Sequence, residues 1–252
     1  MDSIGERLIW YYIPFTDILI PMGGINPITI FNSILVMVIL FSVCFYSVRR
    51  FEMMPGRAQY ILESYVGVFD QLVSNSLEFD TLKENRRFFP LIGTLFIYLL
   101  LCNFIGFFPS HFVEEPTADI NATLGLGILA MSIATYCGIR AKGFGGFVEE
   151  LMGPMFSSKD TKGLGKVAGK LSALFFLPLN IVGELAKVVS ISFRLFGNII
   201  GGAIIIIVVS NLTFYFSWLS VGMDVFFIFF VGTVQAFVFT MLTLTYIAVA
   251  IK

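Results

Sequence analysis

A single arginine lies in the middle of a long apolar stretch in the C-terminal part of the chain. Arg194 lies about 15 residues before the polar sequence 210–213, which is too far for its side chain to reach a membrane surface along a helix. A charge at such a depth is costly and therefore indicates function. Because a guanidinium stays protonated even in a poor dielectric, Arg194 can attract a carboxylate without releasing a proton itself.

Polar and small residues lie on the same helix face as Arg194. At 100° per residue, a helix places six of them within about 40° of it. They are Asn180, Gly183, Lys187, Ser190, Asn198 and Gly201. Close helix packing explains the glycines but not the cation among them. A carboxylate, Glu184, precedes Arg194 by ten residues, or about 15 Å along the axis.

The apolar stretch that follows carries two further polar groups, Gln235 and Asp224. Their separation of eleven residues places them on the same helix face, about 16 Å apart. Asp224 is compatible equally with an ion path and with a simple interfacial carboxylate at a helix end.

The composition excludes a soluble protein. The 252 residues are 57% hydrophobic and only 13% charged, whereas globular domains carry about 25% charged residues. The net charge of −1 argues against a nucleic-acid partner. His111 is the only histidine, and Cys44, Cys102 and Cys137 form no CxxC motif, so we expect no metal site and no cofactor.

Five stretches are long and apolar enough to cross a membrane, which predicts an all-α integral membrane fold. We expect spans at 25–48, 88–112 and 120–139, and two long, tilted helices at 167–209 and 217–251 that form a hairpin. Residues 1–24 are too short and too interrupted to span and are expected to form an outer lead-in.

Two further segments connect the spans. Residues 55–84 form an amphipathic pattern, with Ile61, Tyr65, Phe69 and Leu72 at helical spacing. A helix lying on the inner membrane face and a soluble cap on the spans both fit this pattern. The glycine-rich stretch 143–169 matches no nucleotide-binding motif, so we expect a solvated connection there.

The distribution of charge predicts an orientation. Basic residues cluster in 49–57, 83–87, 140–142 and 159–170, whereas the loop at 110–118 is acidic. By the positive-inside rule the basic loops are cytoplasmic or on the matrix side. The N-terminus is then outside and the C-terminus inside, in agreement with five crossings.

Four motifs together resemble subunit a of the membrane sector of rotary F-type ATP synthases of the bacterial type, in the family's order over about residues 26–252. The first is Glu184-Leu-Ala-Lys187 followed by Ser190-Ile-Ser-Phe-Arg194-Leu-Phe-Gly197-Asn198, and the second runs from Gln235-Ala-Phe to Tyr246. The others are Pro116-Thr-Ala-Asp119-Ile-Asn121-Ala-Thr123 and Pro55-Gly-Arg57-Ala-Gln59 with Glu63.

The resemblance implies a non-catalytic, ion-translocating stator subunit without a cofactor. Its partners would be a rotating ring of c subunits that each carry one carboxyl, b-type peripheral stalk subunits, the remainder of the ATP synthase, and membrane lipids. It implies a bacterial plasma membrane, with a mitochondrial inner membrane as the alternative. Arg194 matches the family's essential arginine and Gln235 its neighbour on the last helix.

Ion movement past such a ring requires two half-channels that do not meet. The orientation assigns Asp119, Asn121, Thr123 and Asp224 to the outer half-channel. Glu184 and Asn180 are assigned to the inner one. Lys187 matches a family lysine, for which a structural role is as good an interpretation as ion handling.

Two positions depart from the family pattern. Many members carry a titratable residue where this chain has Ala203 or Ile228, so the outer path would depend on Asp119 and Asp224 or on water. A free-standing ion channel or secondary transporter is the alternative, although the two halves lack the inverted symmetry common in transporters. The sequence does not distinguish H⁺ from Na⁺, because that selectivity should reside mainly in the ring carboxyl.

Overall fold

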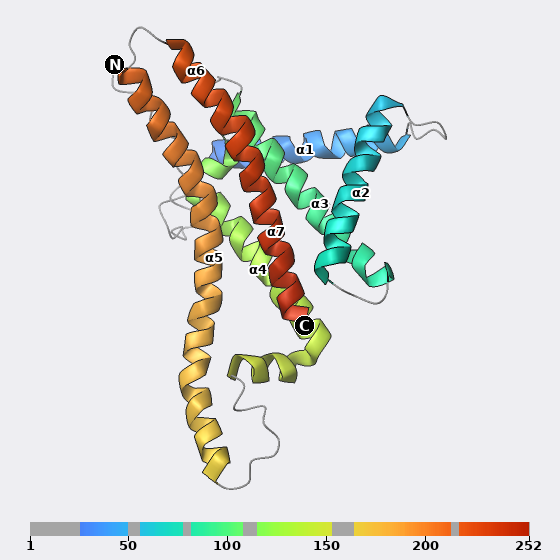
Figure 1. The fold of residues 1–252 in the computed structure, drawn as a ribbon, viewed down its shortest axis with the longest axis vertical. Coiled ribbons are helices and arrows are strands. Elements are labelled where there is room, and N and C mark those ends of the chain that lie inside the picture. Colours follow the sequence, from blue (N-terminus) through green and yellow to red (C-terminus); the bar gives the residue numbers. More distant parts are fainter. Residues whose placement is uncertain are drawn as a thin grey trace, which may run out of the picture. The chain divides into compact units, whose positions relative to one another are not determined.

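The computed structural model describes residues 26–49, 56–77, 82–107, 115–152, 164–212 and 217–251, and it contains no β-strand within these ranges (Figure 1). Five helical segments are long and apolar enough to span a membrane: Pro27–Ser47, Phe88–Phe107, Ile120–Glu149, Phe176–Leu212 and Trp218–Ile251. The predicted all-α integral membrane fold is confirmed. The expected lead-in 1–24 and the end of the second expected span, 108–112, lie outside the described residues.

The chain divides into two compact units. The first comprises Met1–Thr123 and Arg194–Met241, and the second comprises Leu124–Phe193 and Leu242–Lys252. The long helices α5 (Leu164–Leu212) and α7 (Gly232–Ile251) contribute residues to both units.

The first unit contains α1 (Pro27–Arg49), α2 (Arg57–Leu77), α3 (Leu82–Phe104), η1 (Ile105–Phe107), η2 (Pro116–Ala118) and α6 (Ser217–Phe226). The Asn26 side chain accepts a hydrogen bond from the Ile28 amide at 3.0 Å and so caps the start of α1. Val36 of α1 packs against Cys102 and Ile105. The rest of α1 exposes large apolar side chains, as a lipid-facing helix requires.

Helix α2 packs against the span α3 of its own unit. The Tyr65 hydroxyl donates a hydrogen bond to the Gly93 carbonyl at 2.7 Å, and the rings of Tyr65 and Phe69 contact Phe96. Ile61 was expected on the same apolar face but is 67% exposed. The apolar surface of α2 is therefore divided, because only one flank of it is covered by α3. A position on the inner membrane face stays a prediction for the other flank.

The expected solvated connection over the whole of 143–169 is wrong. Helix α4 (Ile120–Met152) continues past Gly143, and α5 begins at Leu164. Gly143 has φ 75°, a conformation that glycine adopts without steric cost. The glycine changes the direction of the helix without ending helical structure, which is why the glycine-rich composition misled the prediction.

The expected helix 217–251 contains a π-helical turn. Figure 1 shows α6 and α7 as one helical ribbon, and the turn η3 (Phe227–Val231) joins them. Such turns are rare, and they occur frequently at functional sites. This one lies between Asp224 and Gln235, two of the predicted site residues.

Candidate functional site

Arg194 lies on an exposed face of α5. Its neighbour Leu195 is fully buried, whereas Arg194 itself is exposed and Phe193 is 50% exposed. Within the described ranges, no residue forms an ion pair or hydrogen bond with the Arg194 guanidinium. The charge is thus presented on an apolar helix surface without a counter-ion from the described part of its own chain.

Asn198 and Gln235 form a direct contact between α5 and α7. The Asn198 Nδ2 donates a hydrogen bond to the Gln235 Oε1 at 2.6 Å. Gln235 is only 5% exposed, and its Nε2 is buried without a hydrogen-bond partner in the described part of the chain. An unsatisfied buried donor is costly, so this group calls for an acceptor.

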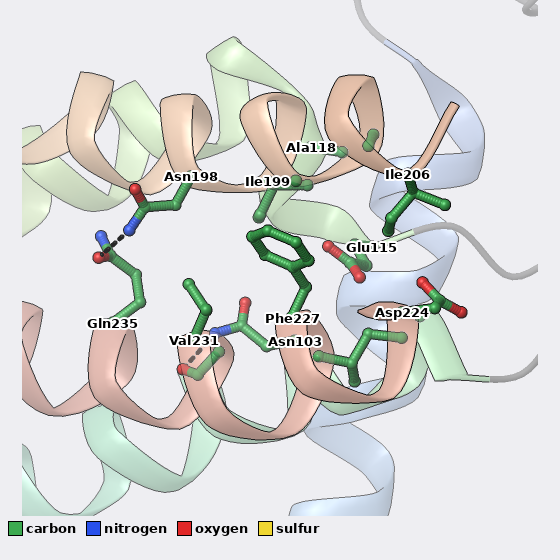
Figure 2. A pocket seen from close by; sticks show the side chains of 15 residues that line it. Asn103, Glu115, Ala118, Asn198, Ile199, Ile206, Asp224, Phe227, Val231 and Gln235 are labelled. Carbon is green, nitrogen blue, oxygen red and sulfur yellow. Dashed lines mark hydrogen bonds between the residues drawn. The ribbon is translucent and has the colours of Figure 1, made fainter. Parts of the chain in front are cut away.

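The Gln235 cavity, as we name it, encloses about 340 Å³ in the first unit (Figure 2). Its lining residues come from α3, η1, η2, α5, α6, η3 and α7. They are Asn103, Gly106, Glu115, Ala118, Asn198, Ile199, Gly202, Ala203, Ile206, Asp224, Phe227, Ile228, Val231, Gly232 and Gln235. None of these described lining residues is basic.

Two carboxylates lie at one end of the Gln235 cavity. Figure 2 shows Glu115 and Asp224 there, with Asn198 and Gln235 at the opposite end. Burial, and secondarily the charge of Asp224, raise the pKa of Glu115 from its ordinary value to about 7. Asp224 was predicted from the sequence but Glu115 was not, because it lies in an acidic loop that we used only to assign orientation.

Asn103 connects the elements around the π turn. This buried residue of α3 donates a hydrogen bond from Nδ2 to the Gly232 carbonyl at 2.9 Å and accepts one from Thr117 at 3.1 Å. A Cβ at Gly232 would lie 3.1 Å from the Asn103 Cβ, so the glycine permits this close approach. Asn103 was not predicted, since a lone asparagine in an apolar run gives no distinctive signal.

Asp119, Asn121 and Thr123 lie together at the start of α4. The Asp119 Oδ1 accepts a hydrogen bond from the Asn121 amide at 2.9 Å, and the Thr123 hydroxyl donates to the Asp119 and Ile120 carbonyls. This arrangement is an N-cap, which a negative charge stabilises further. The three residues are not among the lining residues of the Gln235 cavity, although Ala118 beside them is.

The second unit contains a further cavity of about 440 Å³, the Glu184 cavity. Its lining residues are Met131, Ala134, Thr135, Phe147, Asn180, Gly183, Glu184, Lys187, Thr245, Tyr246, Val249 and Ala250. The Lys187 Nζ lies 2.6 Å from the Glu184 Oε1 and 5.7 Å from the centre of the Tyr246 ring. The Glu184 Oε2 is buried without a hydrogen-bond partner in the described ranges.

The structure thus places the predicted site residues in three settings. Asn198, Gln235 and Asp224 share the Gln235 cavity, and Asn180 and Glu184 share the Glu184 cavity. Ser190 is exposed on α5 and is not among the lining residues of either cavity. In the described ranges, no group of three His, Cys, Asp or Glu side chains could hold a metal ion.

Five apolar helices and polar cavities that contain ionisable side chains define a polytopic membrane protein. Comparison with known proteins identifies it further. Residues 30–248 match the family model described as ATP synthase A chain. ATP synthase subunit a of Moorella thermoacetica is 32% identical over 221 residues, which cover 87% of this chain and 88% of that protein.

Two other relatives have similar identity. ATP synthase subunit a of Helicobacter pylori is 31% identical over 226 residues, covering 89% of both chains. The sodium ion specific ATP synthase subunit a of Propionigenium modestum is 32% identical over 242 residues, covering 87% of this chain and 72% of that protein. The chain belongs to the ATP synthase subunit a family. It is a non-catalytic integral membrane subunit that functions with the rest of the complex in a bacterial membrane.

Proposed function

We propose that this chain conducts protons through two separate half-channels and couples their flow to rotation of a c-ring. The observation that carries this proposal is the exposed, unneutralised Arg194 on an apolar helix. A buried cation requires a compensating anion, and here that anion would come from a partner. A c-ring whose subunits each present one carboxyl satisfies the requirement, and each carboxylate is attracted to Arg194 as it passes.

The two cavities supply the two half-channels. Each encloses several hundred Å³ and carries polar groups, so each has room for water. They share none of their described lining residues, as two half-channels that do not meet require. We assign the Gln235 cavity to the outer side, with Asp119, Asn121 and Thr123 at its mouth. The Glu184 cavity, with Asn180, is assigned to the cytoplasmic side.

The remaining assignments follow the same scheme. The basic loops place the N-terminus outside and the C-terminus in the cytoplasm. The exposed apolar surface of α5 is available to the c-ring, and b-type stalk subunits would hold the chain against rotation. We take the ion to be H⁺, because a carboxyl group with a pKa of about 7 exchanges protons at physiological pH.

The test is the Arg194→Ala variant in the whole ATP synthase, reconstituted into vesicles. ATP-driven proton pumping should be lost in complexes that still contain the c-ring. Arg194→Lys should fail too, because a desolvated lysine loses its proton more readily and has a different reach. Coupled pumping retained in an assembled Arg194→Ala complex would refute the proposal.

A further inference from the structure

Only two described residues that line the Gln235 cavity can exchange protons near neutral pH, namely Glu115 and Asp224. Ala203 and Ile228, where many family members carry a titratable side chain, line the same cavity. The cavity therefore lacks a titratable group on α5 and on the π turn. Glu115 adds one from a different element, the segment just before η2.

The Glu115 side chain is held in a close-fitting site. It packs against Gly106 of η1, where an added Cβ would overlap the Glu115 carboxylate and the two preceding carbon atoms. The residue at position 106 must therefore lack a side chain for Glu115 to adopt this position. Because Gly106 also lines the cavity, the carboxylate is positioned at the cavity wall and not in a surface loop.

Gln235 provides an independent indication that the cavity accommodates a ligand. Its Nε2 is a buried donor without a partner in the described part of the chain, and the side chain lines the cavity. A water molecule or a carboxylate oxygen would satisfy it. The cavity thus has a carboxyl at one end and an unsatisfied donor at the other, with room for water between them.

We propose that Glu115 is the proton-accepting residue of the outer half-channel in this chain, in place of the titratable groups absent at positions 203 and 228. Glu115 takes a proton from the outer solution and gives it to water in the cavity. The water chain delivers a proton at the Asn198–Gln235 pair to the ring carboxylate, and the Glu115 carboxylate is then reprotonated from outside. This inference rests on the proposed function.

The electrostatic setting supports this role. The groups that act on Glu115 are Asp224 of α6 and, more weakly, the Cys102 thiol of α3, with which it interacts electrostatically. Burial and Asp224 together raise the pKa of Glu115 to about 7. A relay is most effective when its pKa is close to the operating pH, because it then both accepts and releases protons readily.

The experiment uses the complete ATP synthase in vesicles and measures ATP synthesis driven by an imposed proton gradient. Glu115→Gln should lower the rate about tenfold, since water replaces a positioned acid–base group only in part. The Ala203→Glu substitution in that background should restore at least half of the rate, because residue 203 lines the same cavity. Ile228→Glu is the second rescue variant, and the exposed Glu149→Gln is the matched control, with an unchanged rate.

The outcomes separate this inference from the proposed function. A Glu115→Gln complex with an unchanged rate and unchanged dependence on outer pH would overturn the inference. So would an assembled Glu115→Gln complex that neither rescue variant restores, because Glu115 would then be structural. Arg194→Ala is measured alongside: if it pumps normally the proposed function fails, and if it is inactive while Glu115→Gln is normal only the inference fails.

Discussion

The two cavities handle charge in different ways. In the Gln235 cavity Glu115 faces a second carboxylate, Asp224, and none of the described lining residues is basic. In the Glu184 cavity the only described lining carboxylate lies 2.6 Å from the ammonium group of Lys187. The first cavity collects negative charge, whereas the second neutralises it within one turn of a helix.

This difference indicates how the two half-channels could divide the work. Two neighbouring carboxylates favour retention of a proton, so the Gln235 cavity is suited to capturing protons from a dilute outer solution. A carboxylate with its own cation does not need a proton to balance its charge, so the Glu184 cavity is suited to passing protons on. The predictions below test this contrast, in order of decreasing expected effect.

Glu184→Gln should impair the inner half-channel most. The substitution removes the only described lining carboxylate of the Glu184 cavity and leaves the Lys187 ammonium without its counter-ion. We expect ATP-driven acidification of inverted vesicles to slow about tenfold while assembly is retained, because water carries protons less effectively than a positioned carboxyl. Unchanged pumping would show that the proton path bypasses Glu184, and Glu149→Gln serves as the charge-matched control.

Gly202→Val should narrow the Gln235 cavity. A Cβ at residue 202 would already lie 3.1 Å from the Phe227 ring, and both residues line the cavity. The two extra methyl groups of valine should lower the rate of gradient-driven synthesis severalfold, whereas Gly202→Ala requires only a small shift and should have a lesser effect. Equal rates for glycine, alanine and valine at this position would exclude the cavity as a proton path.

Asp224→Asn should change the pH dependence more than the maximal rate. Removing the negative neighbour lowers the pKa of Glu115, although burial, the larger cause of its elevation, remains. The outer pH that gives half-maximal synthesis should therefore move to lower values, by less than about one pH unit. The measurement is the synthesis rate over outer pH 5 to 9; a move to higher pH would contradict the contrast drawn between the two cavities.

Substitutions at Asp119 should have the smallest effect on transport. Asp119→Ala removes the side-chain acceptor that caps α4 and should cost about 1 kcal/mol of stability, seen as a lower thermal unfolding temperature of the complex. Asp119→Asn retains a capping oxygen, so the stability should stay close to that of the wild type. If Asp119→Asn alone abolished synthesis, Asp119 would be part of the obligatory proton path and not only of its mouth.

The sequence predicted the all-α fold and the polar residues of the long helices, because charges in apolar stretches are conspicuous. It predicted that Asn198 and Gln235 belong to one site, and the structure joins them by a hydrogen bond. Glu115 and Asn103 could not be predicted, since their roles depend on contacts with Gly106 and Gly232, which are distant in sequence from any periodic pattern. The π turn was equally invisible, because its residues are ordinary apolar helix formers.

The central claim is that Arg194 separates two half-channels that both lead to the ring. The most direct measurement is passive proton entry into vesicles that contain the complete complex, with the rotor held still by an inhibitor of ATP turnover. The wild type should be tight, Arg194→Ala should leak protons, and Arg194→Ala combined with Glu184→Gln should leak at least severalfold more slowly. A tight Arg194→Ala complex, or a double variant that leaks as fast as the single one, would contradict the account.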